Sequence, residues 1–209
     1  PLSGIDTVIS AVDQACRVLS HYAVTQHSET TLPTCEEQDG PINLYKSVSC
    51  IRVNYAGEVA AQGLYLGAGL LETQPVLKEF YQHAMEEEFV HLSWCGRRVY
   101  DLGGTVSIWN PLWFCGALFL GAASRAAGAG YALGFVAETE KQVLSHLSSH
   151  LEVLPQQDSK SRAVVRQMIE DERGHGSEAL SLGAYQLPRF VCDMMHVMGK
   201  VLTTLSARG

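Results

Sequence analysis

The sequence predicts an all-α protein, because long amphipathic segments cover most of its 209 residues and strand signals are scarce. Pro and Gly residues separate these segments. Apolar residues make up 46% of the chain and charged residues 18%, an ordinary composition for a folded protein with one sizeable core. We therefore expect residues 1–209 to form a single domain.

The spacing of apolar residues places each helix. An amphipathic segment runs from about Leu2 to Tyr22, and the polar residues 24–41 then indicate a loop. Four long helices are expected at residues 44–71, 76–101, 130–153 and 159–183, and a C-terminal helix at 188–207. Short connections follow the first and third of the four, whereas nearly thirty residues follow the second. This pattern is typical of a ferritin-like four-helix bundle with one long crossover, here with a core bundle at 44–183 and additional N- and C-terminal helices.

Charge and cysteine content exclude several classes of protein. A net charge of −7 and a pI near 5.6 argue against a nucleic-acid partner, which would require clustered cations. The six cysteines form no CxxC pair and are expected to be reduced thiols without disulfides, as in a cytosolic protein: Cys16, Cys35, Cys50, Cys95, Cys115 and Cys192. The first residues have no cationic start and include Asp6, so they do not resemble a signal or transit peptide.

Several polar residues fall on the core faces of the four expected bundle helices. Steps of three and four residues keep side chains on one helix face, and they place a Glu-x-x-His motif there in two helices and a single carboxylate in the other two. The six residues are Glu58, Glu88, His91, Glu140, Glu172 and His175. Glu86 lies off the face of Glu88, and Glu138 points about 200° away from Glu140.

Four carboxylates and two imidazoles in a core require a compensating charge. Burying even one unpaired ion costs several kcal/mol, and the helices carry no matching set of inward Lys or Arg residues. Two divalent metals would supply the charge, and carboxylate with imidazole suits iron or manganese. One Glu from each of two helices plus Glu-x-x-His from each of the other two is the ligand set of carboxylate-bridged di-metal proteins.

Residues near these ligands have less certain roles. Asp171 precedes Glu172 and could orient His91 from across the bundle, or it could be a solvated acid. His146 lies off the face of Glu140, and the pair formed by His146 and His150 is interpreted as surface-facing, with a further metal site as the alternative. Four further residues share the core face and are interpreted as packing: Tyr55, Gln62, Tyr65 and Cys95.

The crossover at 109–128 is almost entirely apolar, with Arg125 as its one charge. Its first uninterrupted apolar run, 111–123, is thirteen residues long, whereas a helix needs about twenty to span a bilayer. A helix lying in the membrane interface is therefore expected, with Trp109 and Trp113 at the headgroup level. A buried core helix and an oligomer contact are the alternatives.

From about residue 44 onward the sequence resembles the bacterial demethoxyubiquinol hydroxylases of ubiquinone biosynthesis. The resemblance rests on RVNYAGEVAAQGLY at 52–65, EEEFVHLSWC at 86–95, LGFVAETEKQV and the following HL within 133–147, and DERGH at 171–175. It implies that the same six residues bind iron and that His146 lies close to the active site. The sequence departs from the family at Arg173 and Gly174, where members usually carry acidic or other helix-favouring residues, and a Gly inside a helix costs up to about 1 kcal/mol relative to Ala.

The resemblance also implies a function. It indicates a monooxygenase with two Fe ions per chain, Fe²⁺ in the active reduced form, that uses dioxygen to hydroxylate a polyprenyl demethoxybenzoquinol. Such an enzyme would be peripheral on the cytoplasmic face of the bacterial inner membrane, and its partners would include the membrane surface and a protein of a ubiquinone-biosynthesis complex. The apolar crossover could line the entry path of the polyprenyl tail. The alternatives are a di-manganese catalase, an iron oxidase, or a non-catalytic membrane-interaction module whose metals only brace the bundle.

Overall fold

The computed structural model describes residues 4–20, 32–33 and 43–208. Within them the protein is all-helical, and its helices are α1 (Gly4–Leu19), α3 (Leu44–Leu70), α4 (Pro75–Asp101), α5 (Asn110–Ala127), α6 (Ala129–Val153), α7 (Ser159–Ser181) and α8 (Arg189–Ser206). The four predicted bundle helices begin and end within two residues of α3, α4, α6 and α7. Most of the expected loop at 24–41 lies outside the described residues, as does Cys35; the five described cysteines are free thiols.

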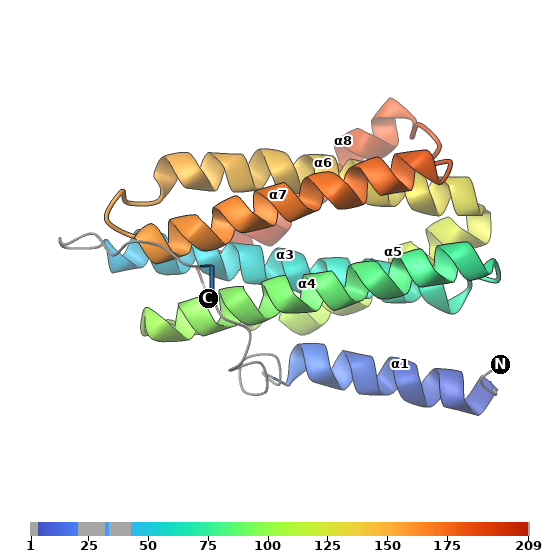
Figure 1. Ribbon diagram of the computed structural model, residues 1–209, viewed down its shortest axis with the longest axis horizontal. Helices are drawn as coiled ribbons and strands as arrows, with labels where there is room; N and C mark the ends of the chain where they lie inside the picture. The colour runs from blue at the N-terminus through green and yellow to red at the C-terminus, as the bar shows by residue number, and fades with distance from the viewer. Residues whose placement is uncertain (1–3, 21–31, 34–42, 209) are drawn as a thin grey trace.

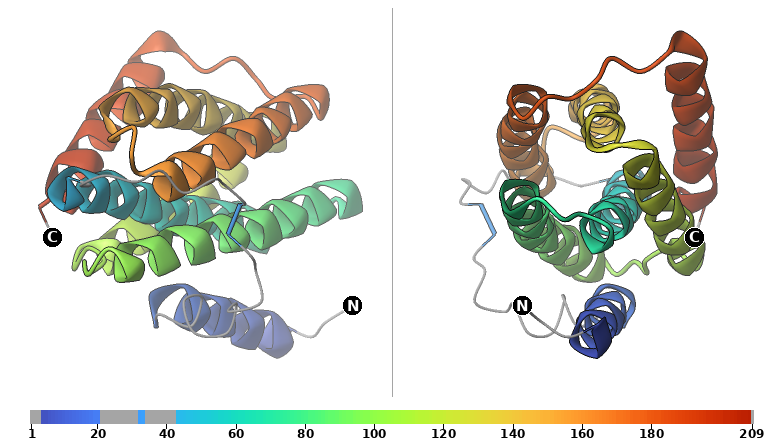
Figure 2. Two further views of the ribbon diagram at one scale, coloured as in Figure 1. Left: turned by 60° about the vertical axis from the view of Figure 1, so that its left-hand side comes forward. Right: turned by 90° about the vertical axis from the view of Figure 1, so that its right-hand side faces the viewer.

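The fold is a ferritin-like helical bundle with additional terminal helices (Figure 1). Helices α3, α4, α6 and α7 run alongside one another, and α1 packs against α3. The right-hand view of Figure 2 shows α8 on the opposite side of the bundle from α4 and α7. The crossover contains α5, so the long connection between α4 and α6 is itself mostly helical.

Local sequence signals explain where the bundle helices begin. Asn43 accepts a hydrogen bond from the Lys46 backbone N–H at 3.2 Å, and Asp158 caps α7 by accepting one from the Ser161 N–H at 3.0 Å. Pro75 begins α4, where a missing N–H has no consequence. Gly128 has a φ of 141°, which separates α5 from α6. Helix α7 continues without a break through Gly174.

Helix α5 packs so closely on α3 that glycine is required at their contact. A Cβ atom added to Gly67 would lie 2.0 Å from the Leu118 carbonyl oxygen, and one added to Gly121 would lie 2.1 Å from the Leu64 carbonyl oxygen. One face of α5 is therefore buried, as the core-helix alternative required, while Leu112 on its other face is 54% exposed.

The apolar character of the crossover does not make α5 a membrane span. No helix among the described residues combines the length and apolarity needed to cross a bilayer. The Trp113 indole N–H donates a hydrogen bond to the Ser206 hydroxyl at 3.1 Å, so it links α5 to α8 and is not available to lipid headgroups. Trp109 is 39% exposed, and among the described residues no hydrogen bond joins its indole ring to α8.

Candidate metal centre

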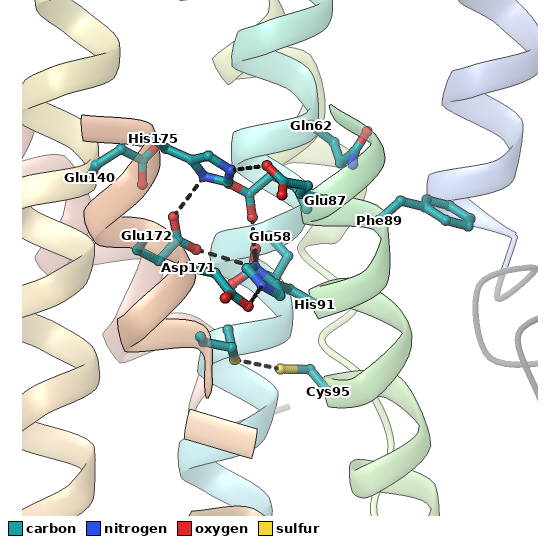
Figure 3. Close-up of polar contacts among 12 residues, drawn as sticks. Glu58, Gln62, Glu87, Phe89, His91, Cys95, Glu140, Asp171, Glu172 and His175 are labelled. Carbon is teal, nitrogen blue, oxygen red and sulfur yellow. Dashed lines mark hydrogen bonds and ion pairs between the residues drawn. The ribbon is translucent and has the colours of Figure 1, made fainter. Parts of the chain in front are cut away.

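The six residues selected by core periodicity meet in the middle of the bundle. Each is at most 3% exposed: Glu58 on α3, Glu88 and His91 on α4, Glu140 on α6, and Glu172 and His175 on α7. Figure 3 shows side chains from facing helices converging on one another. Glu86, by contrast, is exposed, as its position off the core face predicted.

The donor atoms form two overlapping groups. Glu58, Glu88, His91 and Glu172 make up one group, and Glu88, Glu140, Glu172 and His175 make up the other. Within each group the donor atoms all lie within 4.8 Å of one another. Two carboxylates belong to both groups, while each group has one carboxylate and one imidazole of its own. This arrangement suits two cations, for which Glu88 and Glu172 would be shared ligands.

Both imidazoles turn the same nitrogen toward the carboxylates. His91 Nδ1 lies 3.2 Å from Glu88 Oε2 and 3.3 Å from Glu172 Oε1. His175 Nδ1 lies 3.1 Å from Glu88 Oε1 and 3.2 Å from Glu172 Oε2. A single N–H cannot point along both directions at once, whereas a cation between the three groups would satisfy all of them. The donor set therefore fits bound metal.

The opposite nitrogen of each imidazole contacts an acid outside the six. His91 Nε2 lies 3.1 Å from Asp171 Oδ2, and His175 Nε2 lies 2.7 Å from Glu87 Oε2. A proton on each Nε2 would leave the Nδ1 lone pair facing inward, which is the tautomer that a metal ligand needs. Sequence reasoning singled out Asp171 but missed Glu87. The signal was available, because each acid directly precedes the glutamate of a Glu-x-x-His motif.

Tyr65 does more than pack. Its hydroxyl donates a hydrogen bond to Glu140 Oε1 at 2.5 Å, so it fixes the orientation of a candidate ligand. The packing interpretation holds better for two neighbours. Gln62 donates to the Met85 carbonyl at 2.6 Å and accepts from Gln14 at 2.8 Å, and the Cys95 sulfur contacts that of Met168.

The surface-facing interpretation of His146 and His150 is wrong. His150 is 8% exposed, and its Nδ1 lies 2.7 Å from Asn54 Oδ1 on α3. His146 is partly buried, and its ring centroid lies 4.0 Å from that of His150. The prediction used only the angle from Glu140 around one helix, and it could not account for the partner that α3 supplies.

Burial and mutual contacts set the charges of the six residues. Burial, reinforced by neighbouring carboxylates, raises the pKa of Glu58 and of Glu140 well above the ordinary glutamate value. Burial opposes the charging of His175, but hydrogen bonds to Glu172 and Glu88 raise its pKa to about 12. The pKa of His91 is raised in the same way by Asp171, Glu172 and Glu88. Protons thus balance the carboxylates of the ligand-free protein.

Metal binding should consequently strengthen as the pH rises. Ligation needs ionised carboxylates and free Nδ1 lone pairs, so entering cations must displace protons from His91, His175, Glu58 and Glu140. Each proton released makes the apparent affinity about tenfold higher per pH unit. We expect competition with a chelating dye, corrected for the dye's own protonation, to show tighter Fe²⁺ binding at pH 8 than at pH 6. An affinity independent of pH would contradict this charge assignment.

A cavity of about 770 Å³ reaches the cluster from one side. Helices α3, α5, α6 and α8 supply most of its lining, which is mainly apolar. Glu58, Glu88, Glu140 and Glu172 also line it, so a molecule inside could approach both groups of donor atoms.

Known proteins are similar to this chain over nearly its whole length. The family described as "Ubiquinone biosynthesis protein COQ7" matches residues 46–206, which include all six candidate ligands. A 3-demethoxyubiquinol 3-hydroxylase from Francisella tularensis subsp. novicida (strain U112) is 38% identical over 207 residues, covering 99% of this chain and 98% of that protein. A protein of the same name from Legionella pneumophila (strain Paris) is 39% identical over 213 residues, covering 98% and 97%. The chain belongs to the COQ7 family of ubiquinone biosynthesis proteins.

Proposed function

We propose that this protein is a 3-demethoxyubiquinol 3-hydroxylase that holds two iron ions in its bundle. The observation that carries the proposal is the meeting of the two overlapping donor groups with a mainly apolar cavity. The names of the relatives support it, because proteins 38% and 39% identical over almost the full chain are 3-demethoxyubiquinol 3-hydroxylases.

Each residue of the cluster has a defined part in holding the metals. Glu88 and Glu172 would bind both ions, while Glu58 with His91 and Glu140 with His175 would complete one site each. Asp171 and Glu87 would keep the imidazoles in the required tautomer. When bound, two ferrous ions supply the redox chemistry that activates dioxygen.

The remaining contribution of the protein is to position the quinol and to exclude water from the site. A cavity of about 770 Å³ can take the ring of a quinol together with the first part of its polyprenyl tail. The mainly apolar lining favours such a molecule over water, and the four carboxylates at the cavity wall bring its ring close to the metals. A catalase or an iron oxidase acts on small polar substrates and has no need for an apolar cavity of this size.

A single-turnover experiment tests the proposed reaction. Iron-loaded, chemically reduced protein is mixed with demethoxyubiquinol and isotopically labelled dioxygen, and the quinol is examined by mass spectrometry. We expect one labelled oxygen on the ring, the second oxygen atom of each dioxygen leaving as water. A ring that returns unhydroxylated, or that carries oxygen from water alone, would refute the hydroxylase assignment in favour of another di-metal activity.

We also propose that α5 and α8 rest on a membrane surface at the cytoplasmic face of the bacterial inner membrane. Both helices line the cavity, and both expose large apolar side chains, including Leu112 and Phe119 on α5 and Phe190 and Val197 on α8. A quinol with a polyprenyl tail resides in the bilayer, so docking through these helices would bring the cavity to its substrate.

Membrane docking predicts a charge-sensitive association with lipid. Leu112→Asp combined with Phe119→Asp should reduce co-sedimentation with liposomes by at least about tenfold, because each charge opposes insertion into the interface. Leu180→Asp is the matched control, since Leu180 is 64% exposed on α7, on the other side of the bundle from α8 (Figure 2). Equal binding of all three proteins would mean that this face contacts a partner protein or another copy instead.

A further inference from the structure

Two polar side chains that line the mainly apolar cavity each have one nitrogen without a hydrogen-bond partner among the described residues. Asn54 lines the cavity and is only 3% exposed, and its Nδ2 is buried with no partner among the described residues. His146 also lines the cavity, and its Nε2 is likewise buried and unpartnered there. A buried polar atom without a partner destabilises the folded state, so each of these atoms favours a ligand that completes its hydrogen bonding.

The positions of both residues relate them to the candidate metal centre. Asn54 precedes Glu58 by four residues on α3, so the two side chains lie on the same helix face one turn apart. His146 follows Glu140 on α6, and Glu58 and Glu140 line the same cavity. A small ring held by Asn54 and His146 would therefore lie next to the carboxylates that bind the metals.

Surrounding contacts hold the two side chains in place. Asn54 Oδ1 lies 2.7 Å from His150 Nδ1, which can donate its proton to it and so fixes the amide. If the amide were turned over, the other amide atom would be free instead, and Asn54 would still have one unused hydrogen-bonding group. The His150 ring in turn packs edge-on against the His146 ring at 4.0 Å.

His146 is suited to a neutral hydrogen-bonding role. Burial lowers its pKa, and burial together with His146 lowers the pKa of His150 to about 3. A neutral imidazole offers one N–H donor and one lone pair, so His146 can accept a hydrogen bond from a ring hydroxyl or donate one to a ring carbonyl. An amide has the same versatility.

We propose that Asn54 and His146 bind the oxygen substituents of the quinol ring and so orient the ring toward the carboxylate cluster, while the apolar cavity wall takes the tail. This inference rests on the proposed function, because the ring in question is that of the proposed quinol substrate. A benzoquinol fits because its two hydroxyl groups can each donate or accept a hydrogen bond, whereas its tail is apolar.

Two ligands with the same tail, one with oxygens on its ring and one without, distinguish recognition of the ring oxygens from general packing in the cavity. The first is a ubiquinone with a short isoprenoid tail, and the second is a benzene ring that carries the same tail and no oxygen. Calorimetric titration of each into the iron-loaded, oxidised protein gives two dissociation constants for every variant. Asn54→Leu and His146→Phe remove the polar atoms with little loss of volume, and His146→Gln keeps a hydrogen-bonding group.

We expect Asn54→Leu and His146→Phe each to weaken quinone binding about tenfold, with binding of the oxygen-free ligand changed less than twofold. His146→Gln should recover most of the quinone affinity. Ser148→Ala, a change on the exposed face of α6 outside the cavity lining, should leave both constants unaltered. If Asn54→Leu does not fold, because His150 loses its partner, the two His146 variants decide the question.

Two results would overturn the inference. Unchanged quinone affinity in the variants would show that these residues do not contact the ring oxygens. An equal loss of affinity for both ligands would show that they only shape the cavity. In either case an unchanged protein that still hydroxylates demethoxyubiquinol keeps its proposed function, whereas failure of the unchanged protein to bind the quinone at all would remove both.

Discussion

Glu172→Ala is expected to reduce bound iron from two ions per chain to well below one and to slow quinol hydroxylation by at least about 100-fold. The reason is that Glu172 belongs to both donor groups, so its removal takes an oxygen ligand from each site at once. Helix content should be retained, because the side chain lies in a cluster whose remaining carboxylates are relieved of one neighbouring negative charge. Iron analysis, mass spectrometry of the quinol product over time and circular dichroism measure the bound iron, the hydroxylation rate and the helix content.

A comparison with two other glutamates sharpens this prediction. Glu58 belongs to one donor group only, so Glu58→Ala should retain about one iron per chain. Glu170 lies two residues before Glu172 on α7 but is exposed and pairs with Arg173, so Glu170→Ala should bind iron as the unchanged protein does. Equal iron loss in Glu58→Ala and Glu172→Ala would contradict a role for Glu172 in both sites, and full loading in Glu172→Ala would exclude it as a ligand.

The helices and the six clustered residues could be predicted because one periodicity governs both. A residue that continues an apolar series by steps of three and four must face the core, whatever its own polarity. The apolar residues in the same series therefore predicted that Glu88 and Glu172 face the core. Burial of an acid then requires compensation, which led from position to chemistry. Neither step needs knowledge of how the helices pack.

Residues whose roles depend on a second helix were harder to place. Glu87 reaches His175 on α7, Tyr65 reaches Glu140 on α6, and His150 reaches Asn54 on α3. In each case the deciding contact joins residues at least 75 positions apart in the chain, so the helix that carries one of them gives no signal of its partner. Glu87 is the partial exception, because its place before Glu88 repeats that of Asp171 before Glu172.

The symmetry between Glu87 and Asp171 has a structural explanation. The two Glu-x-x-His motifs lie on α4 and α7, which contact each other across the bundle. The residue before the glutamate of each motif therefore reaches the outer nitrogen of the histidine on the other helix. Two copies of one short motif on facing helices thus supply both the ligands and the acids that orient them.

The close packing of α5 on α3 could not be predicted from the sequence either. Glycines occur in both segments, but the sequence does not show that the two segments face each other. Gly63 and Gly67 lie on α3, and a Cβ atom on either would meet the backbone of Phe114 or Leu118. The two helices can approach this closely because at each of these contacts one helix has glycine, which leaves room for the backbone of the other. The crossover is thereby fixed to the bundle, and Ala117 and Leu120 are held in the cavity wall.

Gly67→Ala is accordingly expected to destabilise the protein by about 3 kcal/mol or more, because a Cβ atom 2.0 Å from the Leu118 carbonyl oxygen must push two backbones apart. Urea unfolding followed by circular dichroism measures the change. Gly116→Ala is the control on α5, since its Cβ would meet nothing within 4 Å, and it should be neutral or stabilising by up to about 1 kcal/mol.

Displacement of α5 should affect the cavity before it affects the metal cluster. The helix supplies Ala117 and Leu120 to the cavity wall but none of the six clustered residues. Folded Gly67→Ala protein, studied well below its unfolding temperature, should therefore bind iron normally and bind a short-chain quinone more weakly. Iron loss without any change in quinone affinity would show instead that α5 braces the metal centre, and an unfolding free energy equal to that of Gly116→Ala would show that the two backbones have room to separate.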